Sequence, residues 1–217
     1  MVAKNRRRGA GSAGRRGHES RVRIIGGAWR RRWLPVADVQ GLRPTADALR
    51  ETLFNWLQPH LPGARVLDLY AGTGALGFEA ASRGAQSVLM VERDRRAVAR
   101  LQQAVEELGA SGVEVRCADA ARLLEAGPDV AAPFHVVFLD PPFERDLLAP
   151  ALRTLAGEGW LAPGGRVYVE LEAHRDPAEV TGAQWHILRE RTAGQARGLL
   201  LEPAEPLFCS TPGHSLP

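Results

Sequence analysis

The residue types that are scarce in this chain narrow its class before any motif is considered. Its 217 residues include only two cysteines, Cys117 and Cys209, too few for a disulfide framework or a cysteine-rich metal site. Both stand in apolar surroundings, so we expect buried, reduced thiols and no bound metal. No window reaches the roughly 18 apolar residues of a membrane span, and the arginine-rich start lacks the apolar stretch of a secretory signal. We therefore expect a cytoplasmic protein that does not contact a membrane.

Basic residues concentrate at the amino-terminal end, and all but one of them in the whole chain are arginines. Residues 1–33 hold 11 Lys and Arg against one acid, Glu19, whereas residues 34–217 carry 17 basic and 24 acidic residues, a balance of −7. A positive arm on an acidic globule favours a polyanion such as RNA or DNA. The alternatives are a solvated tail whose arginines reflect genome composition, or an organellar transit peptide, which the glycines disfavour.

Length and composition predict one main domain with an amino-terminal extension. A chain of this length with 45% hydrophobic residues can bury one sizeable core. Residues 1–20 contain almost no large apolar side chain, so they are expected to be a disordered basic tail. Residues 210–217 contain Pro and Gly and are expected to be a flexible tail. We expect residues 21–60 to form a hairpin and a helix that contact RNA, and residues 61–209 to form the main domain.

The extension combines arginines with tryptophans. Residues 22–25 and 28–34 predict two short strands around the Gly26-Gly27 turn, with Trp29 and Trp33 among three arginines. This pattern indicates a basic, aromatic hairpin. After it, Thr45 is placed to cap a helix. The apolar face of that helix, which should dock on the main domain, consists of Leu49, Leu53, Phe54, Trp56 and Leu57.

From residue 65 onward, the hydrophobic periodicity alternates between strand and helix. This alternation is typical of an α/β fold with a mostly parallel, doubly wound sheet. After Gly164-Gly165 the pattern is rich in strands, and the last two strands are expected to form a hairpin around Gly194 that adds an antiparallel edge. The expected strands are 66–69, 87–91, 113–117, 134–139, 166–170, 185–190 and 199–201, and the expected helices are 74–82, 95–108, 120–124 and 147–155.

The segment from Asp68 to Gly77 has the composition of a nucleotide-binding loop. It follows the first strand of the main domain and opens the first helix, and Glu92 ends the next strand. Glycines let the backbone approach a ligand closely, and an acid ending the second strand is placed to accept both ribose hydroxyls. The predicted cofactor contacts are Asp68, Tyr70, Ala71, Gly72, Thr73, Gly74, Glu92, Asp119, Ala120 and Asp140.

Two cofactor classes compete for this crevice. Residues 72–77 fit the dinucleotide pattern G-x-G-x-x-G, which is a weak signal by itself. Asp68, however, ends the strand, and a carboxylate there would repel a pyrophosphate. The ammonium and sulfonium groups of S-adenosylmethionine suit that carboxylate, so we predict this cofactor. Asp119 is placed to meet the adenine amino group or to cap the helix that begins at Ala120, and the two roles are compatible.

Residues 134–143 predict a buried strand that ends at Asp140-Pro141-Pro142-Phe143. Prolines donate no hydrogen bond, so neighbouring carbonyls stay free to accept. The Asp140 carboxylate and the Pro141 carbonyl can take both N–H bonds of a substrate amino group while Phe143 covers its ring. For this segment alone, a stiff turn after a core strand is the alternative. Together with the crevice, it indicates a methyltransferase whose catalytic residues are Asp140, Pro141 and Phe143.

Further segments are more specific than the crevice. They are residues 23–27, 42–45, 50–57, 71–77, 140–143, 159–161 and 193–195. Through them, residues 21–209 resemble the bacterial small-subunit (16S) ribosomal RNA guanine-N2 methyltransferases. Two of these segments are specific to this family, namely Arg-Pro-Thr at 43–45 and Arg-Glu-Thr-Leu-Phe-Asn-Trp-Leu at 50–57. Other methyltransferases share only the crevice and the Asp-Pro-Pro-Phe element. Arg31 departs from the family, which usually has glycine there, and the arginine-rich tail is longer than usual.

The resemblance implies a Rossmann-like, seven-stranded class I methyltransferase fold and methylation of one guanine of 16S rRNA near the P site. The partner would be 16S rRNA or the assembling small ribosomal subunit, and we expect a monomer. The predicted RNA contacts are Arg23, Trp29, Arg30, Arg32 and Arg43, because structured RNA is bound through phosphates and unstacked bases. Core packing is the alternative for Trp29, and it is the preferred interpretation for Trp56.

Two other functions stay open at this stage. The tetrapeptide recognises an amino group and not a particular base, so adenine N6, cytosine N4 or a protein glutamine are alternative acceptors. The chain could also be a non-catalytic RNA-binding assembly factor. The intact Asp-Pro-Pro-Phe segment argues against that second alternative, because binding alone does not need it.

Overall fold

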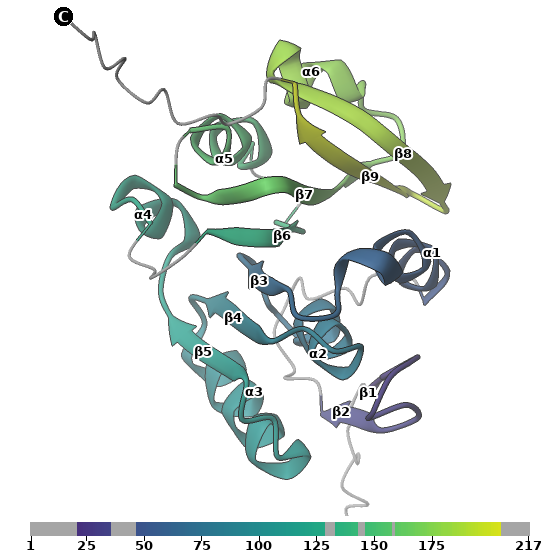
Figure 1. Cartoon of the computed structure of the whole chain (residues 1–217), viewed down its shortest axis with the longest axis vertical. Helices are drawn as coiled ribbons and strands as arrows, with labels where there is room; N and C mark the ends of the chain where they lie inside the picture. Colours follow the sequence, from purple (N-terminus) through teal and green to yellow (C-terminus); the bar gives the residue numbers. More distant parts are fainter. Residues whose placement is uncertain (1–20, 36–46, 129–132, 143–145, 158, 205–217) are drawn as a thin grey trace, which may run out of the picture.

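The computed structural model describes residues 21–35, 47–128, 133–142, 146–157 and 159–204, which contain a seven-stranded sheet (Figure 1). From edge to edge its strands are β5 (Val113–Cys117), β4 (Ser87–Glu92), β3 (Arg65–Asp68), β6 (Phe134–Leu139), β7 (Leu161–Glu172), β9 (Ala196–Pro203) and β8 (Trp185–Ala193). The first five strands are parallel, and β9 runs antiparallel to both β7 and β8. The predicted parallel sheet with an antiparallel edge is therefore confirmed.

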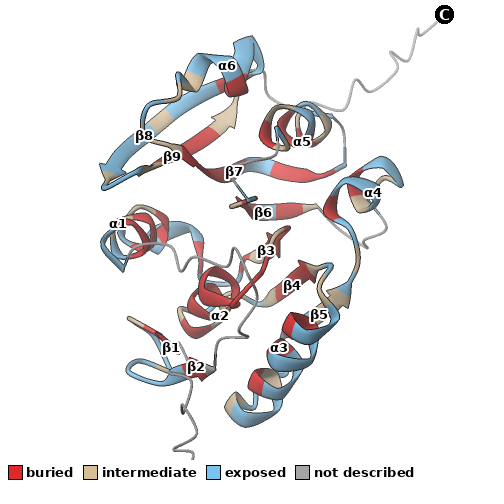
Figure 2. Ribbon diagram, turned by 180° about the vertical axis from the view of Figure 1, so that it is seen from behind, coloured by how far each residue is buried: buried red, intermediate tan, exposed pale blue. Residues whose placement is uncertain are grey.

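Helices cover both faces of this sheet (Figures 1 and 2). On one face lie α1 (Asp47–Leu57), α2 (Ala75–Ser82) and α3 (Arg95–Leu108), and on the other lie α4 (Ala120–Glu125), α5 (Leu148–Leu155) and α6 (Pro177–Thr181). Successive strand residues point to opposite faces. Val136 and Phe138 of β6 accordingly pack with the first set of helices, and Val137 packs with the second. Short 3-10 turns follow α1 at Gln58–His60 and α6 at Gly182–Gln184.

The amino-terminal extension forms an antiparallel hairpin of β1 (Arg21–Arg23) and β2 (Trp33–Pro35). The predicted hairpin is confirmed, but its predicted second strand is too long, because residues 28–31 form a turn. The Arg31 N–H donates to the Ile24 carbonyl and the Ile24 N–H donates to the Arg32 carbonyl, both at 2.9 Å. These bonds close a wider loop, in which Arg31 adopts a φ of 69°.

Helix α1 buries Leu49, Leu53, Phe54 and Leu57, as its predicted apolar face requires. Trp56 is half-buried and packs against the same core, which confirms the packing interpretation. The predicted cap at Thr45 lies outside the described residues. Since Val22, Ile24 and Leu34 also join this core, the hairpin, α1 and the sheet share one apolar cluster.

One helix, α6, was not predicted, and the expectation about Cys117 is wrong. Helix α6 lies in the carboxyl-terminal segment, which is rich in strands as expected; Asp176 caps it by accepting the Ala178 N–H at 2.9 Å, and Pro177 occupies its first turn. Cys117 is exposed rather than buried, because it ends the edge strand β5, and Cys209 lies outside the described residues. Among the helices of the described ranges, none has the length and apolar character needed to cross a bilayer.

Candidate active site

Three carboxyl side chains gather at the carboxyl ends of the central strands. Asp68 of β3 pairs in register with Phe138 of β6, which in turn pairs with Tyr168 of β7. Asp140 and Glu170 follow Phe138 and Tyr168 by two positions, so they point to the same face of the sheet. The acids therefore meet on the side that α1, α2 and α3 cover.

Asp68 lies beneath the loop that joins β3 to α2. Its side chain is 1% exposed, and its Oδ2 accepts the Gly77 N–H at 3.1 Å. Burial and, next, the negative charge of Asp140 raise the pKa of Asp68 to about 7. Asp68 thus closes the turn into α2, and a positive charge nearby would favour its ionised form.

Glu170 belongs to this site, although no motif in the sequence pointed to it. It is 5% exposed and accepts a hydrogen bond from the Tyr168 hydroxyl at 3.2 Å. Burial and, next, the charge of Asp140 raise its pKa to about 8. Gly198 leaves room for this pair, because a Cβ there would lie 2.6 Å from the Tyr168 hydroxyl oxygen. The sequence feature that could have pointed to Glu170 is a single acid inside the apolar run 167–171.

The glycine loop is held by Glu92 at the end of β4. One Glu92 oxygen accepts the Gly72 N–H at 2.9 Å, and the other accepts the Asp94 N–H at 2.8 Å. Gly72 and Gly74 have φ values of 51° and 76°, which favour glycine. The Ala71 N–H donates to the Val91 carbonyl. Glu92 therefore ties two neighbouring loops into one fixed surface.

Tyr70 follows β3 and Asp119 follows β5, at the same edge of the sheet on either side of β4. Burial and, next, the charge of Asp119 raise the pKa of the half-buried Tyr70 to about 12. Asp119 accepts the N–H groups of Ala121 and Arg122 at 3.0 and 3.2 Å. The prediction that Asp119 caps helix α4 is confirmed. Contact between Asp119 and a ligand stays a prediction. Thr73 and Ala120 are both buried at the same edge.

The Asp-Pro-Pro segment ends β6 beside these groups. Asp140 is half-buried, Pro141 is buried and Pro142 is exposed, while Phe143 lies outside the described residues. The charge of Asp140 acts on Asp68, Tyr168 and Glu170. Asp140 is therefore the partly accessible member of a buried acidic group.

The arrangement fits a cationic nucleoside better than a pyrophosphate. Two buried acids have pKa values raised to about 7 and about 8, so added negative charge would be unfavourable there and positive charge favourable. The glycine loop and the acid ending β4 are arranged as a nucleoside requires. These acids and the glycine loop thus suit S-adenosylmethionine.

A hollow of about 400 Å³ lies at the carboxyl end of β7, next to the turn between β8 and β9. Its lining includes Glu172, His174 and Gln195. The turn is fastened to β7, because the Ala173 N–H donates to the Gln195 carbonyl at 2.8 Å. Since β6 and β7 are parallel, this hollow opens at the same edge of the sheet as Asp140.

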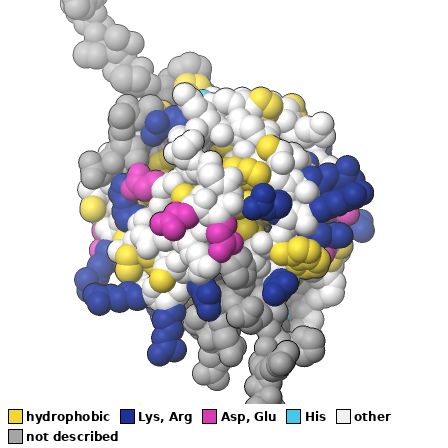
Figure 3. All heavy atoms as spheres, turned by 90° about the horizontal axis from the view of Figure 1, so that it is seen from below, with side chains coloured by type: hydrophobic (Ala, Val, Ile, Leu, Met, Phe, Trp, Pro, Cys, Tyr) yellow, Lys and Arg dark blue, Asp and Glu magenta, His cyan; other side chains and the backbone are white. Residues whose placement is uncertain are grey.

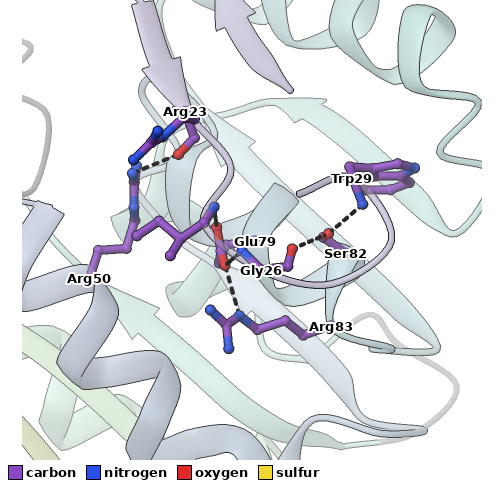
Figure 4. Close-up of polar contacts among 8 residues, drawn as sticks. Arg23, Gly26, Trp29, Arg50, Glu79, Ser82 and Arg83 are labelled. Atoms are coloured by element: carbon purple, nitrogen blue, oxygen red, sulfur yellow. Dashed lines mark hydrogen bonds and ion pairs between the residues drawn. The ribbon is translucent and has the colours of Figure 1, made fainter. Parts of the chain in front are cut away.

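The predicted RNA contacts lie on the hairpin and its loop, apart from this edge. Arg23, Arg30 and Arg32 are exposed, whereas Trp29 is half-buried against the core. The Arg23 carbonyl accepts a hydrogen bond from buried Arg50 at 2.7 Å (Figure 4). Arg43 lies outside the described residues. Among the described residues, the structure therefore brings the predicted cofactor and catalytic residues to one edge of the sheet, and it places the predicted RNA contacts on the hairpin.

Comparisons with known proteins find relatives that match most of this chain. The family model described as "Conserved hypothetical protein 95" matches residues 22–202. "Ribosomal RNA small subunit methyltransferase D" of Escherichia coli (strain K12) is 44% identical over 174 residues, which are 80% of this chain and 86% of the relative. Its counterpart of the same name in Haemophilus influenzae is 41% identical, with 80% and 89% covered.

A solved structure shows the same architecture. The structure of yhhF from Escherichia coli superposes with a TM-score of 0.74 at 41% identity, and the match covers 85% of this chain and 98% of that one. The expected Rossmann-like class I methyltransferase fold is confirmed, and so is the family resemblance. The chain belongs to the family of ribosomal RNA small subunit methyltransferase D.

Proposed function

We propose that this protein methylates the exocyclic N2 amine of one guanine in 16S rRNA, near the P site of the small subunit. Membership of the family supports the coarser statement, methylation of ribosomal RNA with S-adenosylmethionine. The observation that carries the proposal is Asp140, a partly accessible carboxyl at the end of β6 beside buried Glu170 and Asp68.

S-adenosylmethionine supplies the methyl group from its sulfonium. Glu92 would accept the ribose hydroxyls, because each carboxylate oxygen has a second lone pair beyond its backbone bond. Tyr70 and Asp119 would border the adenine. Asp68, which is 1% exposed, would act mainly through its charge and by holding the turn, and less through direct contact.

The substrate amine needs to be held in line, since its lone pair is conjugated into the guanine ring. Asp140 and the Pro141 carbonyl would accept its two N–H bonds and so keep the nitrogen pointed at the methyl group. The Asp140 carboxylate would also offset the positive charge that develops on this nitrogen. Stacking of Phe143 on the flipped base stays a prediction for a residue outside the described ranges.

The neighbours of Asp140 make it suited to this task. Glu170, with its pKa raised to about 8, is mostly protonated near neutral pH. A protonated Glu170 adds no negative charge beside Asp140. The proton that the amine releases during or after transfer then meets carboxyl groups whose proton affinity lies near the working pH.

The identity of the product nucleoside tests the proposal. Small ribosomal subunits from cells that lack this gene would be incubated with the protein and labelled S-adenosylmethionine, and the RNA would then be digested to nucleosides. We expect N2-methylguanosine as the labelled product. N6-methyladenosine or N4-methylcytidine would overturn the choice of base, and absence of any product would favour a binding role.

A further inference from the structure

The hairpin has two different faces. Val22 and Leu34 are paired across it and are 4% and 1% exposed, so they form its inner, packed face. Arg23 and Trp33 form the next pair, and both are exposed. Since side chains alternate along a strand, Arg21 shares their outer face. The outer face therefore carries one large aromatic ring with two arginines around it.

Trp33 is unusually accessible for a tryptophan. Its exposed fraction is 57%, and Ile187, at 42%, is the other large hydrophobic side chain exposed among the described residues. A single exposed apolar residue is ordinary on a protein surface. A tryptophan directly opposite an arginine, with Cβ atoms about 5 Å apart, is a different arrangement. It offers a ring face to an unstacked base and guanidinium groups to the adjoining phosphates.

The loop of the hairpin is anchored to α2 by buried polar groups (Figure 4). Glu79 is 0% exposed, and its oxygens accept the N–H groups of Ile25 and Gly26, both at 2.7 Å. The Ser82 hydroxyl donates to the Gly26 carbonyl at 2.6 Å and accepts the Trp29 N–H at 2.9 Å. These bonds hold the hairpin in one position relative to the domain.

Close approach to the backbone of α2 explains Gly27, and close approach to the Arg83 side chain favours a small residue at Gly26. A Cβ on Gly27 would lie 1.8 Å from the Ser82 carbonyl oxygen, and one on Gly26 would lie 2.5 Å from the Arg83 guanidinium. At the other side of the loop, Arg32 donates to the Glu107 carbonyl at the end of α3, at 3.0 Å. A hairpin fixed at both sides loses little further entropy on binding.

The anchor lies away from the reacting edge. Helix α2 starts after the glycine loop and ends at Ser82, and eight residues of helix span about 12 Å. Figure 3 views the molecule from the lower side of Figure 1, where Figure 1 draws β1 and β2, and shows arginine or lysine side chains near hydrophobic ones on that surface. The outer face of the hairpin is therefore a separate surface from the site around Asp140.

We propose that Trp33 stacks on an unpaired base of the RNA while Arg21 and Arg23 contact neighbouring phosphates, as a second contact apart from the methylated nucleotide. Glu79 and Ser82 act as positioning residues for this surface. The inference rests on the proposed function in one respect, namely that RNA is the substrate.

The test compares Trp33→Ala with Trp33→Phe and with Ile187→Ala, which removes the other exposed apolar side chain. With small subunits from cells lacking this gene, we expect Trp33→Ala to raise KM for the subunit about tenfold, within the range for loss of one base–aromatic stack, at unchanged kcat. Trp33→Phe should recover most of the affinity, and Ile187→Ala should match the wild type. Thermal unfolding checks that all three variants fold.

Binding to deproteinised 16S rRNA at several salt concentrations separates stacking from charge. Trp33→Ala should weaken binding equally at every concentration, whereas Arg23→Ala should reduce the dependence of log K on log salt by about one. Equal KM values for Trp33→Ala and Ile187→Ala would overturn the inference. A loss seen with subunits but not with deproteinised RNA would also overturn it, in favour of a protein partner. If the wild type methylates no RNA, the proposed function fails, while the binding experiment still tests Trp33.

Discussion

Replacement of Glu170 by Gln should stabilise the protein at alkaline pH. Folding raises the pKa of Glu170 from 4.5 to about 8, through burial and then the charge of Asp140. Between these two values the unfolded chain loses this proton and the folded protein retains it. The unfolded state then binds fewer protons, so the free energy of unfolding decreases as pH rises through this window.

The structure sets the size of the effect. A difference between about 8 and 4.5, at about 1.4 kcal/mol for each pH unit, corresponds to a penalty of order 5 kcal/mol above the higher pKa. Glutamine cannot ionise, and its amide can still bond to the Tyr168 hydroxyl. The variant should therefore equal the wild type in stability below about pH 5 and exceed it by several kcal/mol near pH 9.

Urea denaturation at intervals from about pH 5 to about pH 9 measures this difference. Glu114→Gln serves as the control, because Glu114 is an exposed acid on the edge strand β5. Parallel stability curves for wild type and Glu170→Gln would refute the reasoning, as would a less stable variant at high pH. A confirmed gain would mean that the chain retains an acid which lowers its stability, as is common at functional sites.

Three further predictions concern the loop anchor and the cofactor. Gly27→Ala should lose about 3 kcal/mol of stability, because a Cβ clash adds to the left-handed φ, whereas Gly63→Ala, at a φ of 74° in open space, should lose about 1 kcal/mol. Glu79→Ala should lose at least about 3 kcal/mol, since it removes the acceptor of two part-buried N–H groups and the partner of the Arg83 cation. S-adenosylmethionine should bind more tightly at about pH 7.5 than at about pH 6, with proton release, because its charge lowers the raised pKa values of Asp68 and Glu170.

Each of these predictions has a direct check. Denaturation curves compare the stabilities of the variants. Equal losses of stability for Gly27→Ala and Gly63→Ala would contradict the close approach of the loop to Ser82. A Glu79→Ala variant as stable as the wild type would contradict the role of Glu79 in anchoring the hairpin loop. Calorimetric titrations in buffers of different ionisation enthalpy report protons released on cofactor binding. Binding that is independent of pH and releases no proton would contradict the account of the acidic group.

The strands and helices of the main domain could be predicted because local signals agreed with burial. The run 134–139 is buried apart from His135 and became β6 with the predicted limits. Helix α3 also has its predicted limits, since Asp94 caps its start and Gly109 ends it in the left-handed conformation. The nucleotide loop followed from the glycines and acids at strand ends, whose meeting place the parallel topology determines.

Features that depend on tertiary contacts could not be predicted in this way. Glu79 and Glu170 each stand alone among apolar residues, and an isolated acid in such a run equally suits a solvated position. Only the packing shows that Glu79 accepts N–H groups of a distant loop and that Glu170 lies beside Asp140. The diglycine was interpreted as a tight turn, whereas close contact with Ser82 explains Gly27.

The hairpin tryptophans show the same limit. Trp29 and Trp33 stand at the two ends of the same arginine run, residues 30–32. The loop turns Trp29 toward the core, while the strand register places Trp33 outside. Which of the two tryptophans is available to contact RNA depends on the register between β1 and β2, and the sequence alone did not determine that register.

The role of Asp140 is the central claim, and it is tested most directly by measuring cofactor binding and single-turnover methyl transfer on the same preparation of Asp140→Ala. Asp140 is half-buried at the end of β6, whereas the glycine loop is held by Glu92. The account predicts that transfer to the RNA is abolished while the dissociation constant for S-adenosylmethionine stays close to that of the wild type. Loss of cofactor binding together with transfer, or transfer at the wild-type rate, would contradict it.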